Sequence, residues 1–306
     1  MTRIAFVFPG QGSQAVGMGR DLGEASPRWA EASAAVGFDL RTLCFEGPEA
    51  DLMLTANTQP AILTASIVAW DALTAAGVRC DFVAGHSLGE YSALTAAGGV
   101  GFADAVRTVR ARGQFMQDAV PAGAGAMAAI LGLDRALVSQ ACSEAADAGP
   151  VQVANLNGPG QTVIAGATAA VKRAADLAKA KGAKRAVLLP VSAPFHSALL
   201  APAAERLAEV LRGVRFRNLA VPLVTNVDAE FLTEGARVTD TLVRQVTAPV
   251  RWEEVVLRLA KEGVTTCVEV GPGKVLSGLI RRIAPDTQVL NVEDRASLQA
   301  TLEALR

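Results

Sequence analysis

The chain has 306 residues, of which 51% are hydrophobic and only 19% are charged. This composition excludes a disordered chain and suffices for the core of one large domain, or of one domain with an inserted subdomain. The formal net charge of −1, without a block of like charges, gives no electrostatic footprint for nucleic acid or an anionic membrane. We therefore expect its partners to be small molecules or proteins.

Cysteine spacing and hydropathy indicate the compartment. The four cysteines are far apart, so they suggest neither a CxxC metal pair nor a compact disulfide framework. The N-terminal segment reaches Gly10 and Gln11 too soon for the apolar region of a signal peptide. No window approaches the roughly 18 apolar residues that span a bilayer. We expect a soluble, cytoplasmic protein without a metal site.

In the first part of the chain, short β-branched runs alternate with longer alanine-rich stretches. Proline suits the first helical position, so Ser26-Pro27 and Gln59-Pro60 predict helix starts, and Gly77 predicts the end of the second helix. Further elements are predicted at 3–8 (strand), 81–85 (strand), 90–97 (helix) and 102–116 (helix). This alternation is typical of a largely parallel α/β domain.

The middle of the chain follows a different order. The predicted elements are 127–131 (strand), 134–146 (helix), 151–154 (strand), 162–165 (strand), 168–181 (helix) and 185–189 (strand). This βαββαβ order is the split unit of ferredoxin-like folds. Glycine-rich 122–125 and proline-flanked 190–194 would bound it, so we predict an inserted subdomain at 125–193 within a large domain of 1–124 and 194–306. A cleft between the two would be a natural binding site.

The last third returns to alternating elements. Helices are predicted at 201–211 and 252–261, and strands at 223–225 and 266–270. Gly271-Pro272-Gly273 then turns into a helix that we expect to be the last element of the chain.

The segment Gly85-His86-Ser87-Leu88-Gly89 fits the pattern GxSxG. A predicted strand precedes it and a predicted helix follows it, as a nucleophile elbow requires. The glycines permit a tight turn that exposes the serine oxygen, and the helix directs its positive N-terminal end at developing negative charge. Ser87 is therefore a candidate nucleophile. The alternative is a serine that only caps the helix.

A serine hydroxyl needs a base at neutral pH, and this chain has two histidines. His86 adjoins Ser87, but neighbouring side chains on an extended segment point to opposite sides, so its ring should face away from the serine oxygen. His196 is then the candidate base, in a proline-punctuated loop at the edge of the inserted unit. The alternative is a surface or capping histidine, and spacing does not reveal which group orients the imidazole.

The glycine-rich motif PGQGSQ at 9–14 follows the first strand. It contains neither GxxxxGK[ST] nor GxGxxG, which disfavours a phosphate loop. An elbow-type site needs an N–H from a second loop to complete its oxyanion hole, and the Gln11 amide could pair with the Leu88 amide for this purpose. The alternative is a plain βα turn.

The predicted helix at 102–116 has one apolar stripe with Arg110 and Arg112 on its two borders. Either arginine could reach into a site, although solvated arginines on an amphipathic helix are the ordinary case. Periodicity alone does not choose between them.

Seven segments carry a resemblance to a known family. They are PGQGSQ at 9–14, GHSLGEYSAL at 85–94, RGQFMQ at 112–117, NLNGPGQTVIAG at 155–166, PFHS at 194–197, RQVTAPVRW at 244–252 and EVGPGKVLSGL at 269–279. Together they resemble the malonyl-CoA:acyl carrier protein transacylases, and more widely the acyltransferase domains of polyketide and fatty acid synthases. The resemblance implies an α/β-hydrolase-like large domain with a mainly parallel sheet, plus an inserted ferredoxin-like subdomain.

The resemblance also implies roles for particular residues. Ser87 would be the nucleophile, His196 the base, and the Gln11 and Leu88 amides the oxyanion hole. The backbone carbonyl of Gln245 would hold the histidine. Arg112 would pair with the malonyl carboxylate, for which a planar bidentate donor is well suited. His86, Asn155 and Phe195 would line the substrate pocket, with phenylalanine before the histidine favouring malonyl over methylmalonyl.

The implied reaction is a ping-pong transfer of malonyl from malonyl-CoA to the pantetheine thiol of acyl carrier protein, without a cofactor, in a monomeric enzyme of fatty acid synthesis. The first alternative is the same chemistry acting in trans on a polyketide synthase. A serine hydrolase or thioesterase shares the first half-reaction, but the arginine and the inserted unit argue against it. A catalytically silent carrier-binding module is disfavoured because Ser87, His196 and Arg112 are all present.

Overall fold

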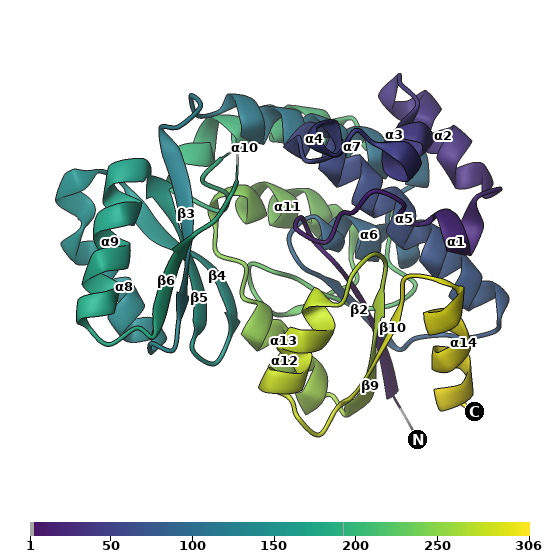
Figure 1. Cartoon of the computed structure of the whole chain (residues 1–306). Helices are drawn as coiled ribbons and strands as arrows, with labels where there is room; N and C mark the ends of the chain where they lie inside the picture. The colour runs from purple at the N-terminus through teal and green to yellow at the C-terminus, as the bar shows by residue number, and fades with distance from the viewer. Residues whose placement is uncertain (1–2, 192) are drawn as a thin grey trace.

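The computed structural model describes residues 3–191 and 193–306, and these form two β-sheets (Figure 1). The larger sheet has the order β10-β9-β1-β2-β7-β8. Its strands are β1 (Arg3–Phe8), β2 (Phe82–Gly85), β7 (Leu223–Val224), β8 (Phe231–Leu232), β9 (Val264–Val270) and β10 (Gln288–Val292). All neighbours pair in parallel except β7 and β8, which are antiparallel.

Helices cover both faces of this sheet (Figure 1). The helices of this part of the chain, some of which pack on other helices and not on the sheet, are α1 (Arg20–Gly23), α2 (Pro27–Val36), α3 (Leu40–Glu46), α4 (Glu49–Leu52), α5 (Thr55–Ala75), α6 (Gly89–Ala96), α7 (Phe102–Asp118), α10 (Ala201–Arg212), α11 (Val238–Thr247), α12 (Trp252–Lys261), α13 (Val275–Ile283) and α14 (Arg295–Ala304), with 3₁₀ turns at Ala198–Leu200 and Gly235–Arg237.

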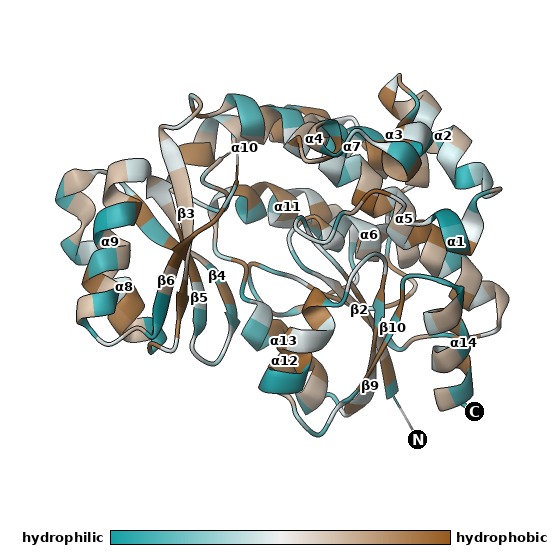
Figure 2. Cartoon of the chain, in the orientation of Figure 1, coloured by the Kyte–Doolittle hydropathy of each residue, from teal (hydrophilic) through white to brown (hydrophobic). Residues whose placement is uncertain are grey.

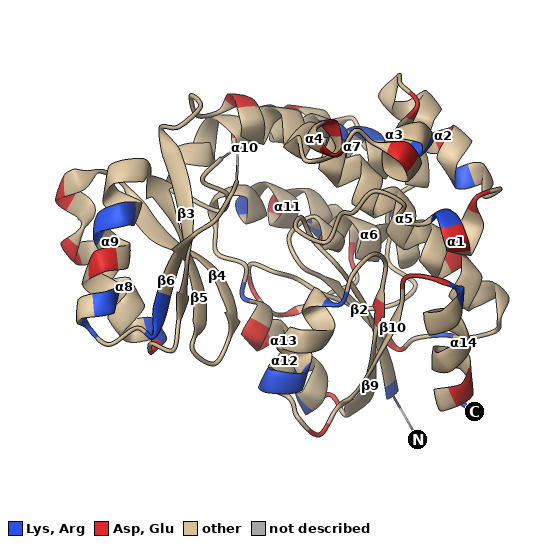
Figure 3. Cartoon of the chain, viewed as in Figure 1, with Lys and Arg blue, Asp and Glu red and all other residues tan. Residues whose placement is uncertain are grey.

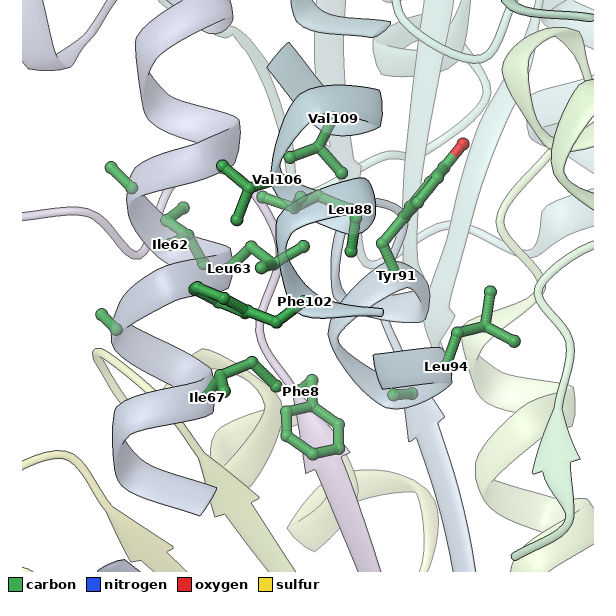
Figure 4. Packing of buried hydrophobic residues seen from close by; sticks show 14 of the residues in the cluster. Phe8, Ile62, Leu63, Ile67, Leu88, Tyr91, Leu94, Phe102, Val106 and Val109 are labelled. Carbon is green, nitrogen blue, oxygen red and sulfur yellow. The ribbon is translucent and has the colours of Figure 1, made fainter. Parts of the chain in front are cut away.

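Strand β1 shows why both faces must be covered. Its side chains alternate, so Phe6 and Phe8 join the apolar cluster formed with α5, α6 and α7, whereas Ala5 and Val7 join the cluster formed with α12 and α13. Figure 4 shows the first cluster, in which Leu88 reaches the same apolar layer as Phe8 and the α5 and α7 side chains. The residue after the candidate nucleophile is therefore anchored in the core.

The smaller sheet is antiparallel and has the order β4-β5-β3-β6. Its elements are β3 (Gly125–Leu131), α8 (Arg135–Glu144), a 3₁₀ turn (Ala146–Ala148), β4 (Val151–Gly158), β5 (Gln161–Ala167), α9 (Thr168–Ala180) and β6 (Arg185–Leu188). Both helices pack on one face of this sheet, and they lie outermost in Figure 1. The βαββαβ order and the mixed α/β fold class are confirmed; the limits 125–193 stay a prediction.

The second face of the small sheet turns toward the large domain. Met127, Val163 and Ala165 pack there with Phe195, which directly precedes His196. Backbone hydrogen bonds from Leu156 to Val250 and from Val250 to Ala154 also join β4 to the segment that follows α11. The two sheets are therefore tied together close to the histidine loop.

Hydropathy and charge follow this layering. Figure 2 shows hydrophobic residues along β3 and hydrophilic ones on the outer helices α9 and α12. In Figure 3 the charged residues lie mainly on outer helices and loops, whereas β2, β4 and β5 carry none. A charged residue at the centre of the molecule therefore needs a specific explanation.

The helix start predicted at Gln59-Pro60 is wrong. Helix α5 begins at Thr55, so Pro60 lies inside it. The first turn packs against α7 at Gly113, where a Cβ would lie 2.7 Å from the Thr55 carbonyl oxygen. This tertiary contact keeps the turn helical although the proline cannot donate a hydrogen bond.

The prediction that the helix after Gly273 is the last element is also wrong, because β10 and α14 follow that helix. Strand β10 lies at the sheet edge and is mostly half-buried, so its sequence lacks the apolar run of a central strand. Helices α1, α3, α4 and α11 and strand β8 were not predicted either. Most are short or begin without a capping side chain, which leaves little local signal.

Candidate active site

The candidate nucleophile lies in the turn between β2 and α6. Ser87 has a φ of 52°, a left-handed conformation that is costly for a residue with a side chain. A Cβ on Gly85 would lie 2.0 Å from the Gly89 backbone, and a Cβ on Gly89 would lie 2.1 Å from the Phe8 carbonyl oxygen. Both glycines are therefore required by space rather than by their φ angles.

We expect Gly85→Ala to lower the free energy of unfolding by about 3 kcal/mol or more, because the new methyl would collide with backbone atoms that cannot move independently. Thermal melting followed by circular dichroism measures this loss. Gly101→Ala is the matched control, since its Cβ would meet nothing closer than 3.6 Å. If Gly85→Ala had the same melting temperature as Gly101→Ala, the steric explanation of the turn would be contradicted.

The Ser87 hydroxyl is hydrogen-bonded to His196 rather than to the helix. Its Oγ lies 2.7 Å from Nε2 of His196, and α6 has no side-chain cap. On the other side of the ring, Nδ1 lies 2.8 Å from the Gln245 backbone oxygen. A carbonyl oxygen only accepts, so Nδ1 carries the proton and Nε2 is left with a lone pair facing the serine. The capping-serine alternative is excluded.

His196 is buried, with only 3% of its surface exposed, which excludes the surface alternative. Burial, and after it the positive charge of Arg112, lowers the pKa of the imidazole to about 3. The ring is therefore neutral at physiological pH. A neutral ring is the form that can accept the serine proton.

Because of this low pKa, we expect the rate at which an acyl thioester acylates the protein to be nearly the same at about pH 8 and about pH 5.5. The base would stay unprotonated throughout that range. An ordinary histidine with a pKa of about 6.5 would lose roughly tenfold at the acid end. Rapid-quench measurement of the acylation rate at each pH tests this, and a tenfold loss would contradict the expected protonation state.

Arg112 extends from α7 to the same hydroxyl and has only 2% of its surface exposed. One Nη donates to Ser87 Oγ at 3.1 Å and to Gln245 Oε1 at 3.0 Å, and the other donates to Gln59 Oε1 at 2.8 Å. All three acceptors are neutral. Burial lowers the pKa of the guanidinium, but arginine remains charged in proteins. The site thus holds a buried cation beside the serine.

Arg110 lies outside this constellation. It donates to Asn57, and its guanidinium stacks 5.2 Å from the centre of the Phe38 ring. The structure therefore brings only one of the two border arginines to Ser87, a choice that periodicity left open.

The backbone amides of Gln11 and Leu88 donate no hydrogen bond to any residue in 3–191 or 193–306. The Ser87 amide, by contrast, donates to Asn226 Oδ1 at 2.6 Å. Gln11 and Leu88 both line the cavity that Ser87 lines, and their amides are unengaged, whereas the amide of Ser87 itself is occupied. This arrangement is what an oxyanion hole made by Gln11 and Leu88 requires, and that role stays a prediction.

A cavity of about 540 Å³ opens over these groups, between the large domain and the inserted unit. Every predicted site residue except Gln245, which supports the site from behind, lines it: Gln11, His86, Ser87, Leu88, Arg112, Asn155, Phe195 and His196. The His86 Nε2 atom lies 2.8 Å from Asn157 Oδ1, and its ring packs near Trp252. His86 is thus a wall of the cavity.

Sequence reasoning missed several residues that support the site. Gln59 holds Arg112, Asn226 holds the Ser87 amide, and Gln152 donates to the His196 carbonyl oxygen at 3.2 Å. Glu90 is fully buried beneath the turn. Glu90 had a signal, since it is the one charged residue in the otherwise uncharged stretch 85–94. The amide residues had none.

In the described ranges, no group of three or more His, Cys, Asp or Glu side chains could hold a metal ion. The same part of the chain contains no helix that is long and apolar enough to cross a membrane.

Comparisons with known proteins agree with this geometry. Residues 5–297 match the family model described as "Acyl transferase domain". The chain is 49% identical to the malonyl CoA-acyl carrier protein transacylase of Bacillus subtilis over 100% of this chain and 98% of that protein. The crystal structure of an acyl-carrier-protein S-malonyltransferase from Burkholderia pseudomallei superposes with a TM-score of 0.96 at 49% identity, covering 99% of this chain and 100% of that one.

A further solved structure is a complex between a type II PKS acyl-carrier protein, AntF in its holo form, and its malonyl-transacylase. Its matching chain gives a TM-score of 0.96 at 47% identity, with 99% of this chain and 100% of that one covered. The family model, the full-length sequence comparison and the fold comparison all indicate the same family. The chain belongs to the acyl transferase family, among the malonyl CoA-acyl carrier protein transacylases.

Proposed function

We propose that this chain transfers a malonyl group from malonyl-CoA to the pantetheine thiol of acyl carrier protein, through a malonyl ester on Ser87. The relatives named above support the substrates. One observation carries the chemistry: a single serine oxygen lies 2.7 Å from a neutral histidine nitrogen and 3.1 Å from a buried arginine. The first contact activates a nucleophile, and the second supplies a partner for an acyl group that carries its own carboxylate.

In the first half-reaction, Ser87 Oγ gives its proton to His196 Nε2 and attacks the thioester carbonyl carbon of malonyl-CoA. The carbonyl oxygen becomes an oxyanion, which the Gln11 and Leu88 amides stabilise. The Gln245 carbonyl keeps the protonated ring in place. The C–S bond then breaks, and His196 returns its proton to the departing CoA thiolate, which leaves malonyl on Ser87.

The second half-reaction uses the same groups in reverse. His196 takes the proton of the pantetheine thiol, whose sulfur attacks the malonyl ester. The second oxyanion occupies the same amide pair. When it collapses, the bond between the malonyl carbonyl carbon and Ser87 Oγ breaks, and His196 protonates the serine oxygen. Acyl carrier protein leaves with malonyl on its thiol, and the enzyme is restored.

Arg112 makes the choice of acyl group electrostatic. A malonyl carboxylate gives the buried guanidinium a charged partner, whereas an acetyl group leaves it with neutral acceptors only. Loss of a buried charge partner is costly, so malonyl is preferred. Phe195 packs against the inserted sheet at the cavity wall and limits the space beside the acyl group, which favours malonyl over a branched analogue.

The residues of the site supply the base, the oxyanion donors and the carboxylate partner, so we propose that the transfer needs no cofactor. We also propose a cytoplasmic monomer of fatty acid synthesis. The four cysteines are free thiols, which suits a reducing compartment. A polyketide pathway is the second candidate, favoured by the complex of a related transacylase with a type II PKS acyl-carrier protein.

Isotope exchange tests the proposed sequence of steps. We expect labelled free CoA to enter malonyl-CoA in the absence of acyl carrier protein, because the first half-reaction is complete and reversible by itself. Absence of exchange would contradict the malonyl-serine intermediate. Steady release of free malonate, with no transfer to acyl carrier protein, would show a hydrolase instead.

A further inference from the structure

Beneath the candidate nucleophile lies a buried carboxylate that the proposed steps do not use. Glu90, on the first turn of α6, has 0% of its surface exposed. Its Oε2 atom accepts two hydrogen bonds, from the Gln245 side-chain amide at 2.8 Å and from the Asn226 backbone amide at 3.0 Å. A buried carboxyl group is costly to retain, so the two residues that it holds indicate its purpose.

The first of these residues leads to the arginine. The Gln245 amide nitrogen donates to Glu90 and to the Ser87 carbonyl oxygen, while its Oε1 accepts from Arg112. Acceptors on one side and a donor on the other fix the orientation of this amide. If it were rotated by half a turn, its NH₂ group would face the donors of Arg112. Glu90 thus helps to keep an oxygen pointed at the guanidinium.

The second residue leads to the strained turn. The Asn226 side chain accepts from the Ser87 amide at 2.6 Å and donates to the Gly85 carbonyl oxygen, also at 2.6 Å. Its backbone amide is the group that Glu90 holds. Three backbone groups of the turn are therefore hydrogen-bonded to the side chains of Asn226 and Gln245, which Glu90 anchors. They are the Gly85 carbonyl oxygen, the Ser87 amide and the Ser87 carbonyl oxygen. Such over-determination is needed to keep Ser87 at a positive φ.

We propose that Glu90 is a positioning residue for malonyl transfer, which acts as a double acceptor that holds Gln245 and Asn226 and, through them, Arg112 and the Ser87 turn. This inference rests on the proposed function. It assigns the role to the acceptor oxygen and not to the negative charge. Burial raises the pKa of the Glu90 carboxyl to about 7, and its Oε1 has no hydrogen-bond partner among the described residues. A proton on Oε1 would leave Oε2 free to accept.

Paired substitutions separate the acceptor from the charge. Glu90→Gln keeps an oxygen that can accept both N–H groups, and Glu90→Met has similar length but no acceptor. We expect Glu90→Met to lose roughly 10- to 100-fold in kcat/KM for malonyl-CoA, because Arg112 and Ser87 are no longer held in register. We expect its preference for malonyl-CoA over acetyl-CoA to fall as well, mainly through kcat. Glu90→Gln should stay within a few-fold of wild type on both measures.

Glu269→Met is the matched control. Glu269 is also fully buried and also accepts two N–H hydrogen bonds, but both come from backbone amides, those of Leu276 and Ser277 at the start of α13. We expect this variant to lose thermal stability without losing the preference for malonyl. If Glu90→Met fails to fold, Glu90→Asp replaces it, because a side chain shorter by one methylene withdraws the acceptor but keeps the carboxylate.

Rates are measured per folded molecule, with purified wild type, both acyl-CoA substrates and acyl carrier protein. Unchanged kcat and unchanged acyl preference in Glu90→Met, or in Glu90→Asp where it is used, would overturn the positioning role. Equal losses in Glu90→Gln and Glu90→Met would overturn the acceptor account, since the charge would then be what matters. If wild type itself transfers no malonyl, the proposed function fails, which is a distinct result.

Discussion

Ser87→Ala gains no malonyl group when it is mixed with malonyl-CoA, and its transfer rate to acyl carrier protein falls by at least about 10⁴-fold. The methyl group cannot attack the thioester, and no other serine within residues 3–191 and 193–306 has the His196 partner that Ser87 has at 2.7 Å. Intact-protein mass spectrometry measures the adduct, and a coupled assay for released CoA measures the rate.

Ser92→Ala is the control for this experiment. Ser92 lies on α6 close to the turn, and its hydroxyl is buried without a hydrogen-bond partner in the described part of the chain. The control should gain the malonyl group as wild type does. A stable malonyl adduct on Ser87→Ala would remove Ser87 from the mechanism.

Arg112→Ala should lose roughly 10²- to 10³-fold in kcat/KM for malonyl-CoA, which is the effect of removing one partner of a buried, hydrogen-bonded charge pair. The loss for acetyl-CoA should be much smaller, because acetyl offers no carboxylate. The ratio of the two kcat/KM values, measured in parallel on one preparation, therefore reports the role of Arg112 without reference to the overall activity.

Two further substitutions sharpen this test. Arg112→Lys keeps a positive charge but loses the planar fork, so it should recover only part of the malonyl preference. Arg110→Ala removes the other border arginine of the same helix, which is engaged with Asn57 and Phe38, and should leave the ratio unchanged. A preference for malonyl that survives in Arg112→Ala would place carboxylate recognition elsewhere in the cavity.

Much of this fold could be predicted because local and tertiary signals agree. The strand at 3–8 and the helix starting at Pro27 appear where the sequence predicts them, since a buried β-branched run and a Ser-Pro cap each specify one structure. The βαββαβ unit was recognisable from element order alone. The start of α5 and the edge strand β10 were not, because a distant helix decides the first and sheet position decides the second.

The residues of the site likewise fall into those that the sequence could predict and those that it could not. Ser87 and His196 carry their chemistry in the residue type, and a chain with only two histidines leaves few choices of base. The residues that hold them carry no such signal. Asn226 and Gln245 act through amides whose value depends on reaching the same turn from loops and helices remote in sequence. Resemblance could name Arg112, but only the fold shows that it contacts the serine oxygen.

One single-turnover measurement tests the central claim that Ser87 carries malonyl between two thiols. Malonylated enzyme, freed of CoA, is mixed with the pantetheinylated acyl carrier protein, and both proteins are followed by mass spectrometry. We expect malonyl to leave Ser87 and to appear on the carrier thiol, with little free malonate. Malonyl that remains on the enzyme, or that appears only as free malonate, would contradict it.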